Sequence, residues 1–146
     1  MKLFLIVTLS AITAGCAGDV NVEQQGEPAT DGVFIHITAG PENPHRVLMA
    51  LQMANIMAET QDVLVYLDIE GVKVVLNDAE DIEFSHFATS HAQIRKLIGA
   101  GATVMACPGC LKVIDKTGED LMDGVQVADK AKFFSFTEGR ILTLDY

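Results

Sequence analysis

The stretch Ala102-Thr-Val-Met-Ala-Cys107-Pro108-Gly109-Cys110-Leu-Lys-Val-Ile114 predicts a buried strand that passes directly into a helix. Residues 102–106 are small or apolar, as expected of a strand inside a sheet. Proline is favoured at the first position of a helix because its missing N–H would have no partner there. Cys107 is therefore predicted to be the N-cap, and Cys110 to lie one turn inside the helix.

This position predicts a reactive sulfur on Cys107. Unpaired N–H groups and the positive end of the helix dipole can lower the pKa of a cysteine below its free value of about 8.5. The thiolate would then be nucleophilic near neutral pH, and Cys110 could attack a sulfur adduct or disulfide formed on it. The structural alternatives are a disulfide or two buried thiols. An oxidising compartment permits a disulfide, but closing so short a loop removes little chain entropy.

Outside this stretch, strands and helices alternate along the chain. Strands are predicted at residues 33–38, 62–69 and 141–144, and helices at residues 45–59, 86–100 and 128–136. Residues 71–76 suit either an extension of the second strand or a turn of helix. The alternation predicts a three-layer α/β/α sandwich with a mostly parallel sheet, in one domain over residues 32–146. Ligand chemistry gathers at the carboxyl ends of the strands in such sheets, which is where Cys107 falls.

Two helices carry start signals. Asn43 and Pro44 are predicted as the N-cap and first residue of the helix at residues 45–59. Ser85 is predicted to cap the helix at residues 86–100. Helical spacing places one apolar face of that second helix on Phe87, His91, Ile94 and Ile98.

The N-terminus has the layout of an export signal. Residues 1–15 combine Lys2 with a short apolar run that is too short to span a bilayer, and small residues precede Cys16. This segment is similar to the bacterial lipoprotein signal, which implies that Cys16 is lipidated and becomes the new N-terminus. Ala17 follows it instead of Asp, which implies sorting to the outer membrane. Residues 16–31 are polar and aperiodic, as in a lipidated N-terminus and flexible tether. The alternative is a buried N-terminal strand.

The composition excludes several kinds of partner. The formal net charge is -10, with 10 Lys and Arg against 20 Asp and Glu, so the chain lacks the clustered basic residues that bind nucleic acid. Anionic membrane surfaces are disfavoured for the same reason. No nucleophile-elbow sequence and no phosphate-binding glycine motif is present, and no cofactor is predicted.

The order of these parts resembles the DsrE/DsrF-like family, which includes the TusD and YchN types. The resemblance covers about residues 32–146. The features that carry it are Phe34-Ile-His-Ile, the Pro44-led helix, Tyr66-Leu-Asp-Ile-Glu-Gly71-Val72, Gly101 before a strand, Ala106-Cys107-Pro-Gly-Cys110-Leu-Lys, and Glu119-Asp-Leu-Met-Asp-Gly124-Val125.

The resemblance implies a single α/β/α domain with a sheet of about five strands, assembled into trimers or hexamers. It also implies sulfur relay with a thiol-bearing donor or acceptor protein or with small sulfur species. Sulfur-carrying members hold a persulfide on a cysteine that matches Cys107, and Cys110 matches a second cysteine of YchN-like members. Asp115 stands where relatives usually have a glycine that closes this helix.

Metal binding has weaker support in the sequence. A lone Cys-x-x-Cys supplies two of the four ligands of a structural zinc, and the spacing of the four histidines, His36, His45, His86 and His91, selects none of them. Met49, Met53 and Met57 recur every four residues, a pattern that suits packing on a helix face and, as an alternative, soft Cu(I) binding. No metal site is predicted.

Three hypotheses for function follow. The first is an extracytoplasmic, lipid-anchored protein on the periplasmic side, which carries or transfers sulfane sulfur as a persulfide on Cys107 with Cys110 as the resolving thiol. The second is a dithiol/disulfide oxidoreductase that uses the same pair. The third is a non-catalytic lipoprotein that binds a partner or a soft metal through its oligomer. Both a sulfurtransferase and a carrier without turnover fit the first hypothesis.

Overall fold

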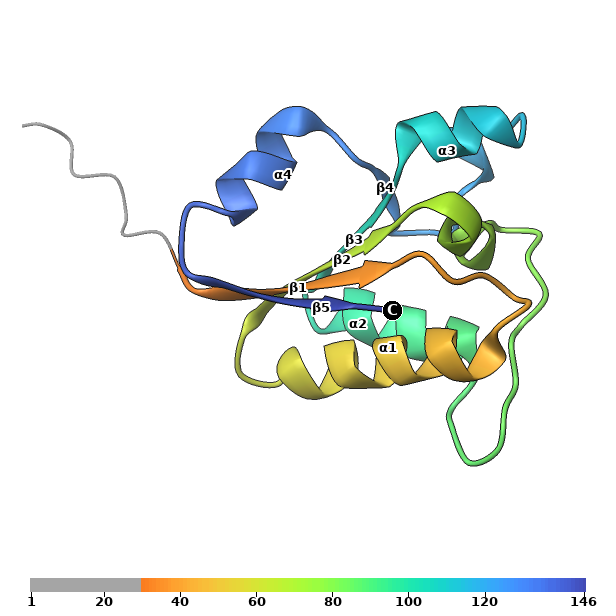
Figure 1. Cartoon of the computed structure of the whole chain (residues 1–146), viewed down its shortest axis with the longest axis horizontal. Helices are drawn as coiled ribbons and strands as arrows, with labels where there is room; N and C mark the ends of the chain where they lie inside the picture. The colour runs from red at the N-terminus through yellow and green to blue at the C-terminus, as the bar shows by residue number, and fades with distance from the viewer. Residues whose placement is uncertain (1–29) are drawn as a thin grey trace, which may run out of the picture.

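In the computed structural model, which describes residues 30–146, a five-stranded parallel sheet lies between two layers of helices (Figure 1). The strand order is β4-β3-β2-β1-β5, and every pairing is parallel. The strands are β1 (Gly32–Ile37), β2 (Asp62–Leu67), β3 (Thr103–Ala106), β4 (Gln126–Val127) and β5 (Ile141–Asp145). The predicted α/β sandwich is confirmed.

The helices divide between the two faces of the sheet. Helices α1 (Pro44–Met57) and α2 (Ser90–Gly99) cover one face, and α3 (Pro108–Val113) and α4 (Lys130–Phe136) lie over the other (Figure 1). Two 3₁₀ helices, η1 (Ile69–Val75) and η2 (Gly118–Asp120), complete the connections.

Strand β1 shows how the two faces differ. Val33, Ile35 and Ile37 alternate along it and are buried, whereas Phe34 and His36 on the opposite face are half-buried. Phe34 packs edge-on against Phe133 of α4, which identifies its face as the α3/α4 side. The main core therefore lies under α1 and α2, and the opposite face is only partly covered.

Helix α1 begins as predicted. The side chain of Asn43 accepts a hydrogen bond from the Arg46 N–H at 3.4 Å, and Pro44 is the first helical residue. The helix buries Val47, Leu48, Ala50, Leu51, Ala54 and Asn55 against the sheet and α2. The three methionines lie outside this set: Met49 is exposed, and Met53 and Met57 are half-buried.

The predicted start of α2 was wrong. The helix begins at Ser90 with Thr89 as its N-cap, and Ser85 lies outside it with a positive φ of 53°. The reason is that Asp81, in the preceding loop, accepts hydrogen bonds from the His91 N–H at 2.8 Å and the Ser90 hydroxyl at 3.0 Å. Asp81 thus provides an acceptor for a free N–H group in the first turn of the helix. Because Asp81 lies outside the helix and its immediate flanks, the local sequence did not indicate this start.

The buried face of α2 differs from the predicted one accordingly. Its buried residues are Ser90, Gln93, Ile94 and Leu97, so only Ile94 of the expected face is fully buried. Phe87 precedes the helix, and the side chain of His91 keeps 18% of its surface exposed. The two polar members of the buried face are tolerated because both make hydrogen bonds.

The structure decides between the two alternatives for residues 71–76 and adds a strand that the sequence did not predict. Residues 71–76 form most of η1 and its C-cap, so the second strand does not continue there. Strand β4 is only two residues long, which is too short to produce a hydrophobic pattern. It pairs with the end of β3 and completes the fifth position of the sheet.

Asp115 closes α3 in the conformation that a glycine would normally supply. Its φ is 54°, and the following Lys116 N–H bonds back to the carbonyl of Leu111 at 3.0 Å. Aspartate is among the few residues that enter the left-handed region at modest cost. The departure from the family pattern therefore leaves the turn intact.

The predicted signal peptide, Cys16 and nearly all of the predicted tether lie outside the described residues. Within residues 30–146, no helix combines the length and the apolar character needed to cross a membrane.

The Gly71→Ala substitution is expected to destabilise the domain by about 1–3 kcal/mol. A Cβ at Gly71 would lie 2.3 Å from the carbonyl oxygen of Ile37, so η1 would have to move away from the end of β1. Gly99→Ala is the control, since nothing lies within 4 Å of the added atom. Chemical denaturation of both variants tests this, and equal unfolding free energies would contradict it.

Candidate functional site

Cys107 sits where β3 ends and α3 begins. Its N–H donates to the carbonyl of Leu67 at 2.9 Å, which continues the β2–β3 pairing by one residue, and Pro108 then starts the helix. The sulfur accepts a hydrogen bond from the Cys110 N–H at 3.5 Å. Cys107 is therefore the N-cap of α3, as predicted.

Cys110 lies one turn into α3, also as predicted, and its sulfur faces the start of η1. The N–H of Ile69 donates to the Cys110 sulfur at 3.1 Å. Cys107 and Cys110 are both half-buried free thiols, and each thiol influences the pKa of the other. The structure thus brings the two predicted site residues together.

Tyr66 is a third member of the site that the sequence did not identify as one. It stands on β2 beside Met105 of β3, two residues before Cys107, and its phenol acts on the pKa of the Cys107 thiol. Burial, and after it the interaction with Cys107, raises the pKa of Tyr66 above its ordinary value. The phenol therefore stays protonated and serves as a donor. Register between neighbouring parallel strands is the signal that could have revealed it.

The pKa values of the two thiols move in opposite directions. Burial alone would raise the pKa of Cys107, but hydrogen bonds from Tyr66, from Cys110 and from the Gly109 amide outweigh burial and lower it. Burial raises the pKa of Cys110. The hydrogen bond from the Ile69 N–H lowers this pKa, but the charges of Cys107 and Asp68 raise it further, so the pKa stays above its ordinary value. The first proton is therefore lost from Cys107, while Cys110 remains a thiol.

A charged cluster lies beside the cysteines at the same edge of the sheet. The Nε2 atom of His36 is 3.0 Å from a carboxylate oxygen of Asp68, and its Nδ1 atom is 2.9 Å from one of Asp145. Asp68 directly precedes Ile69, whose N–H reaches Cys110. The imidazole therefore ties the end of β5 to the residue that borders the site.

The other three histidines lie away from the cysteines. His45 and His86 stack on the phenylalanines of the loop before α2, and His91 is in the first turn of that helix. Within residues 30–146, no three His, Cys, Asp or Glu side chains are grouped so that they could hold a metal ion.

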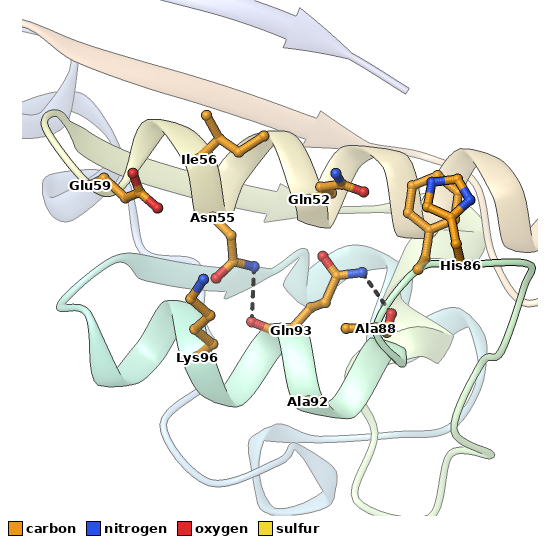
Figure 2. Close-up of a pocket in the computed structure, with 10 residues that line it drawn as sticks. Gln52, Asn55, Ile56, Glu59, His86, Ala88, Ala92, Gln93 and Lys96 are labelled. Atoms are coloured by element: carbon orange, nitrogen blue, oxygen red, sulfur yellow. Dashed lines mark hydrogen bonds between the residues drawn. The ribbon is translucent and has the colours of Figure 1, made fainter.

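A hollow between α1 and α2 is not part of this site. It encloses about 430 Å³ on the opposite side of the sheet from α3 (Figures 1 and 2). Figure 2 shows Asn55 of α1 donating to the Gln93 carbonyl of α2, and the Gln93 side chain donating to the carbonyl of Ala88 in the loop before α2. These bonds account for the two buried amides of the lining by packing, and neither Cys107 nor Cys110 lines the hollow.

Comparisons with known proteins agree with this architecture. The model of the DsrE/DsrF-like family matches residues 31–137. The crystal structure of the ychN protein from E. coli has a TM-score of 0.63 at 17% identity and covers 78% of this chain and 99% of its own. A protein of unknown function from Methanobacterium thermoautotrophicum, MTH1491, has a TM-score of 0.56 at 23% identity, covering 80% and 99% respectively. Among curated proteins, no sequence matches.

Tyr66→Phe is expected to raise the pKa of Cys107, because the thiolate loses its phenol donor while burial stays the same. Less thiolate is then present at neutral pH, so alkylation of Cys107 at pH 7 should slow by about tenfold. The alkylation rate is measured against pH in a Cys110→Ser background, where only one of the two thiols reacts. Tyr146→Phe is the matched control. An unchanged pH profile in Tyr66→Phe would exclude Tyr66 from the site.

Proposed function

Because this chain belongs to the DsrE/DsrF-like family, we propose that it handles sulfane sulfur as a persulfide on Cys107, with Cys110 as the resolving thiol. The observation that carries the proposal is the placement of the two sulfurs at the start of α3, where Cys107 accepts the Cys110 N–H at 3.5 Å and Cys110 accepts the Ile69 N–H at 3.1 Å. In this setting the pKa of the Cys107 thiol is lowered and that of the Cys110 thiol is raised. A sulfur carrier needs this difference, because the Cys107 thiolate must take up the sulfane sulfur while Cys110 is still an unreactive thiol.

Loading is a displacement at sulfur. The Cys107 thiolate attacks a sulfane sulfur of a hydrogen polysulfide or of a protein persulfide, and an S–S bond forms while the donor's S–S bond breaks. Hydrosulfide or the donor thiolate leaves with the electron pair. Before this step the negative charge is on the Cys107 sulfur, where it is stabilised by the Tyr66 phenol and by the amides of Cys110 and Gly109.

Two routes lead the sulfur away from Cys107. A partner thiolate can attack the outer sulfur, which transfers it and restores the Cys107 thiolate. Alternatively, the Cys110 thiolate attacks the inner sulfur, closes a Cys107–Cys110 disulfide and releases hydrosulfide. The disulfide is then reduced by an external dithiol.

Exposed aliphatic side chains around the site support a protein as the partner. Ile69 at the start of η1 is 59% exposed and Val113 at the end of α3 is 83% exposed, and these elements pack beside one another. Large aliphatic groups exposed next to a reactive thiol suit a transient contact. Trimeric or hexameric assembly stays a prediction.

The second candidate function is dithiol/disulfide exchange by the same pair. The placement of both thiols at the start of α3 supports it, since the Cys107 sulfur accepts a hydrogen bond from the Cys110 N–H at 3.5 Å. It differs from sulfur transfer in that no sulfur atom is retained. A non-catalytic binding role, for a partner or a soft metal, remains the third hypothesis and requires that neither thiol react.

We further propose that the domain is anchored to the cell envelope through a lipid on Cys16, facing the periplasm and attached to the outer membrane. The support is the short apolar run of residues 1–15 followed by small residues and Cys16. Residues 17–31 would then act as a tether between the lipid and β1.

Treatment of the reduced protein with polysulfide should add one sulfur atom to Cys107, seen by intact-mass and peptide mass spectrometry. Cys107→Ser should add none. Cys110→Ser, the matched control at the neighbouring thiol, should add the sulfur and retain it longer because the resolving attack is removed. Loss of two hydrogens without retained sulfur would instead identify a redox pair, and inert thiols would leave only the binding role.

Cys16→Ala is expected to move the protein from the membrane fraction to the soluble fraction of a bacterial envelope preparation. The reason is that a thioether-linked lipid needs the Cys16 sulfur. Ala17→Asp is a second variant, which should keep the anchor and shift the protein from outer to inner membrane. Recovery of the wild-type chain as an unlipidated soluble protein would refute the anchor without affecting the sulfur chemistry.

A further inference from the structure

Ile69 has a backbone conformation that its side chain does not favour. Its φ is 49°, in the left-handed region that β-branched residues rarely enter. Packing of the side chain does not explain this conformation, because 59% of the residue is exposed. Strained positions of this kind persist when the surrounding structure fixes them, and they gather at functional sites.

The backbone around Ile69 is fixed on both sides. The N–H of Asp68 donates to the Ile37 carbonyl at 3.2 Å, and the N–H of Gly71 donates to the carbonyls of Asp68 at 2.8 Å and Thr38 at 3.2 Å. Gly71 is pressed so closely against β1 that it has no room for a Cβ. The end of β1 therefore holds the turn in place.

The result of this conformation is a hydrogen bond to sulfur. The peptide between Asp68 and Ile69 directs its N–H at the Cys110 sulfur from 3.1 Å. Cys107 and Asp68 both disfavour a negative charge on Cys110, and such a charge in turn raises the pKa of Tyr66. Among the groups that act on this sulfur, the Ile69 N–H is the one that favours the charge.

We infer that the Ile69 N–H is a positioning donor that stabilises negative charge on Cys110 during the resolving step. The inference rests on the proposed function and assigns a role within it. Cys110 must lose its proton to the solvent before it attacks the inner sulfur of the Cys107 persulfide. The new S–S bond joins Cys107 and Cys110, the persulfide S–S bond breaks, and hydrosulfide leaves with the electron pair. When an external dithiol later reduces the disulfide, Cys110 can leave as a thiolate toward the same N–H.

An amide-to-ester replacement between Asp68 and Ile69 tests this directly, since it removes the N–H while the side chain is kept. The full-length chain carrying the ester is loaded with polysulfide, and hydrosulfide release is followed over time and pH. Release should slow by about tenfold at neutral pH, with its pH profile moved upward. The extent of sulfur loading on Cys107 should be unchanged.

The matched control is the same replacement between Phe84 and Ser85. Ser85 also has a positive φ, and the Phe84 carbonyl accepts a bond from the residue three positions on, as the Asp68 carbonyl does. This control should release hydrosulfide at the wild-type rate.

The possible outcomes separate the two proposals. If Cys107 does not load sulfur in the unmodified protein, the proposed function fails. If Cys107 loads normally but the ester at Ile69 resolves as fast as the control ester, only the positioning role is overturned.

Discussion

The parallel pairing of β2 with β3 is the constraint on which the site depends. Its register places Tyr66 beside Met105 and Leu67 beside Ala106, and the Cys107 N–H extends it by one more bond to Leu67. Directly after this last hydrogen bond, β3 leads into α3 and β2 leads into η1. The two cysteines on the first turn therefore meet the backbone of the second. A shift of one residue in this pairing would move Tyr66 to the other face of the sheet.

The chemistry of the two sulfurs follows from a competition between burial and hydrogen bonding. Both thiols are half-buried, and burial acts against a thiolate at each. Cys107 overcomes burial because its donors come from a phenol, a thiol and amides of the helix start. Cys110 has one amide donor, while Cys107 and Asp68 oppose its ionisation. Two identical side chains three residues apart thus acquire different roles from their surroundings.

The partial covering of one sheet face brings these groups close to solvent. The rings of Phe34 and Tyr66 pack against each other and against Phe133 of α4, with ring-centroid distances of 5.5–6.2 Å. His36 lies beside Tyr66, with ring centroids 5.8 Å apart. On the opposite face, Val33, Ile35 and Ile37 of β1 are buried under α1 and α2. The well-packed half supplies stability, and the partly covered half holds the reactive residues.

Local sequence was sufficient for the elements whose signals are local. The apolar run and Pro108 determined the strand, the helix start and the place of Cys107, and Asn43 with Pro44 determined the start of α1, because caps depend on residues within one turn. The start of α2, the two-residue β4 and the membership of Tyr66 in the site were decided by tertiary structure. Asp81 reaches the first turn of α2 from nine residues away, and Tyr66 meets Cys107 through a partner strand about 40 residues distant. The sequence alone determines which residues can cap, turn or ionise. Only the folded chain brings the Ile69 amide to the Cys110 sulfur. That contact depends on the register of β2 and β3, which cannot be deduced from the spacing of the two residues in the sequence.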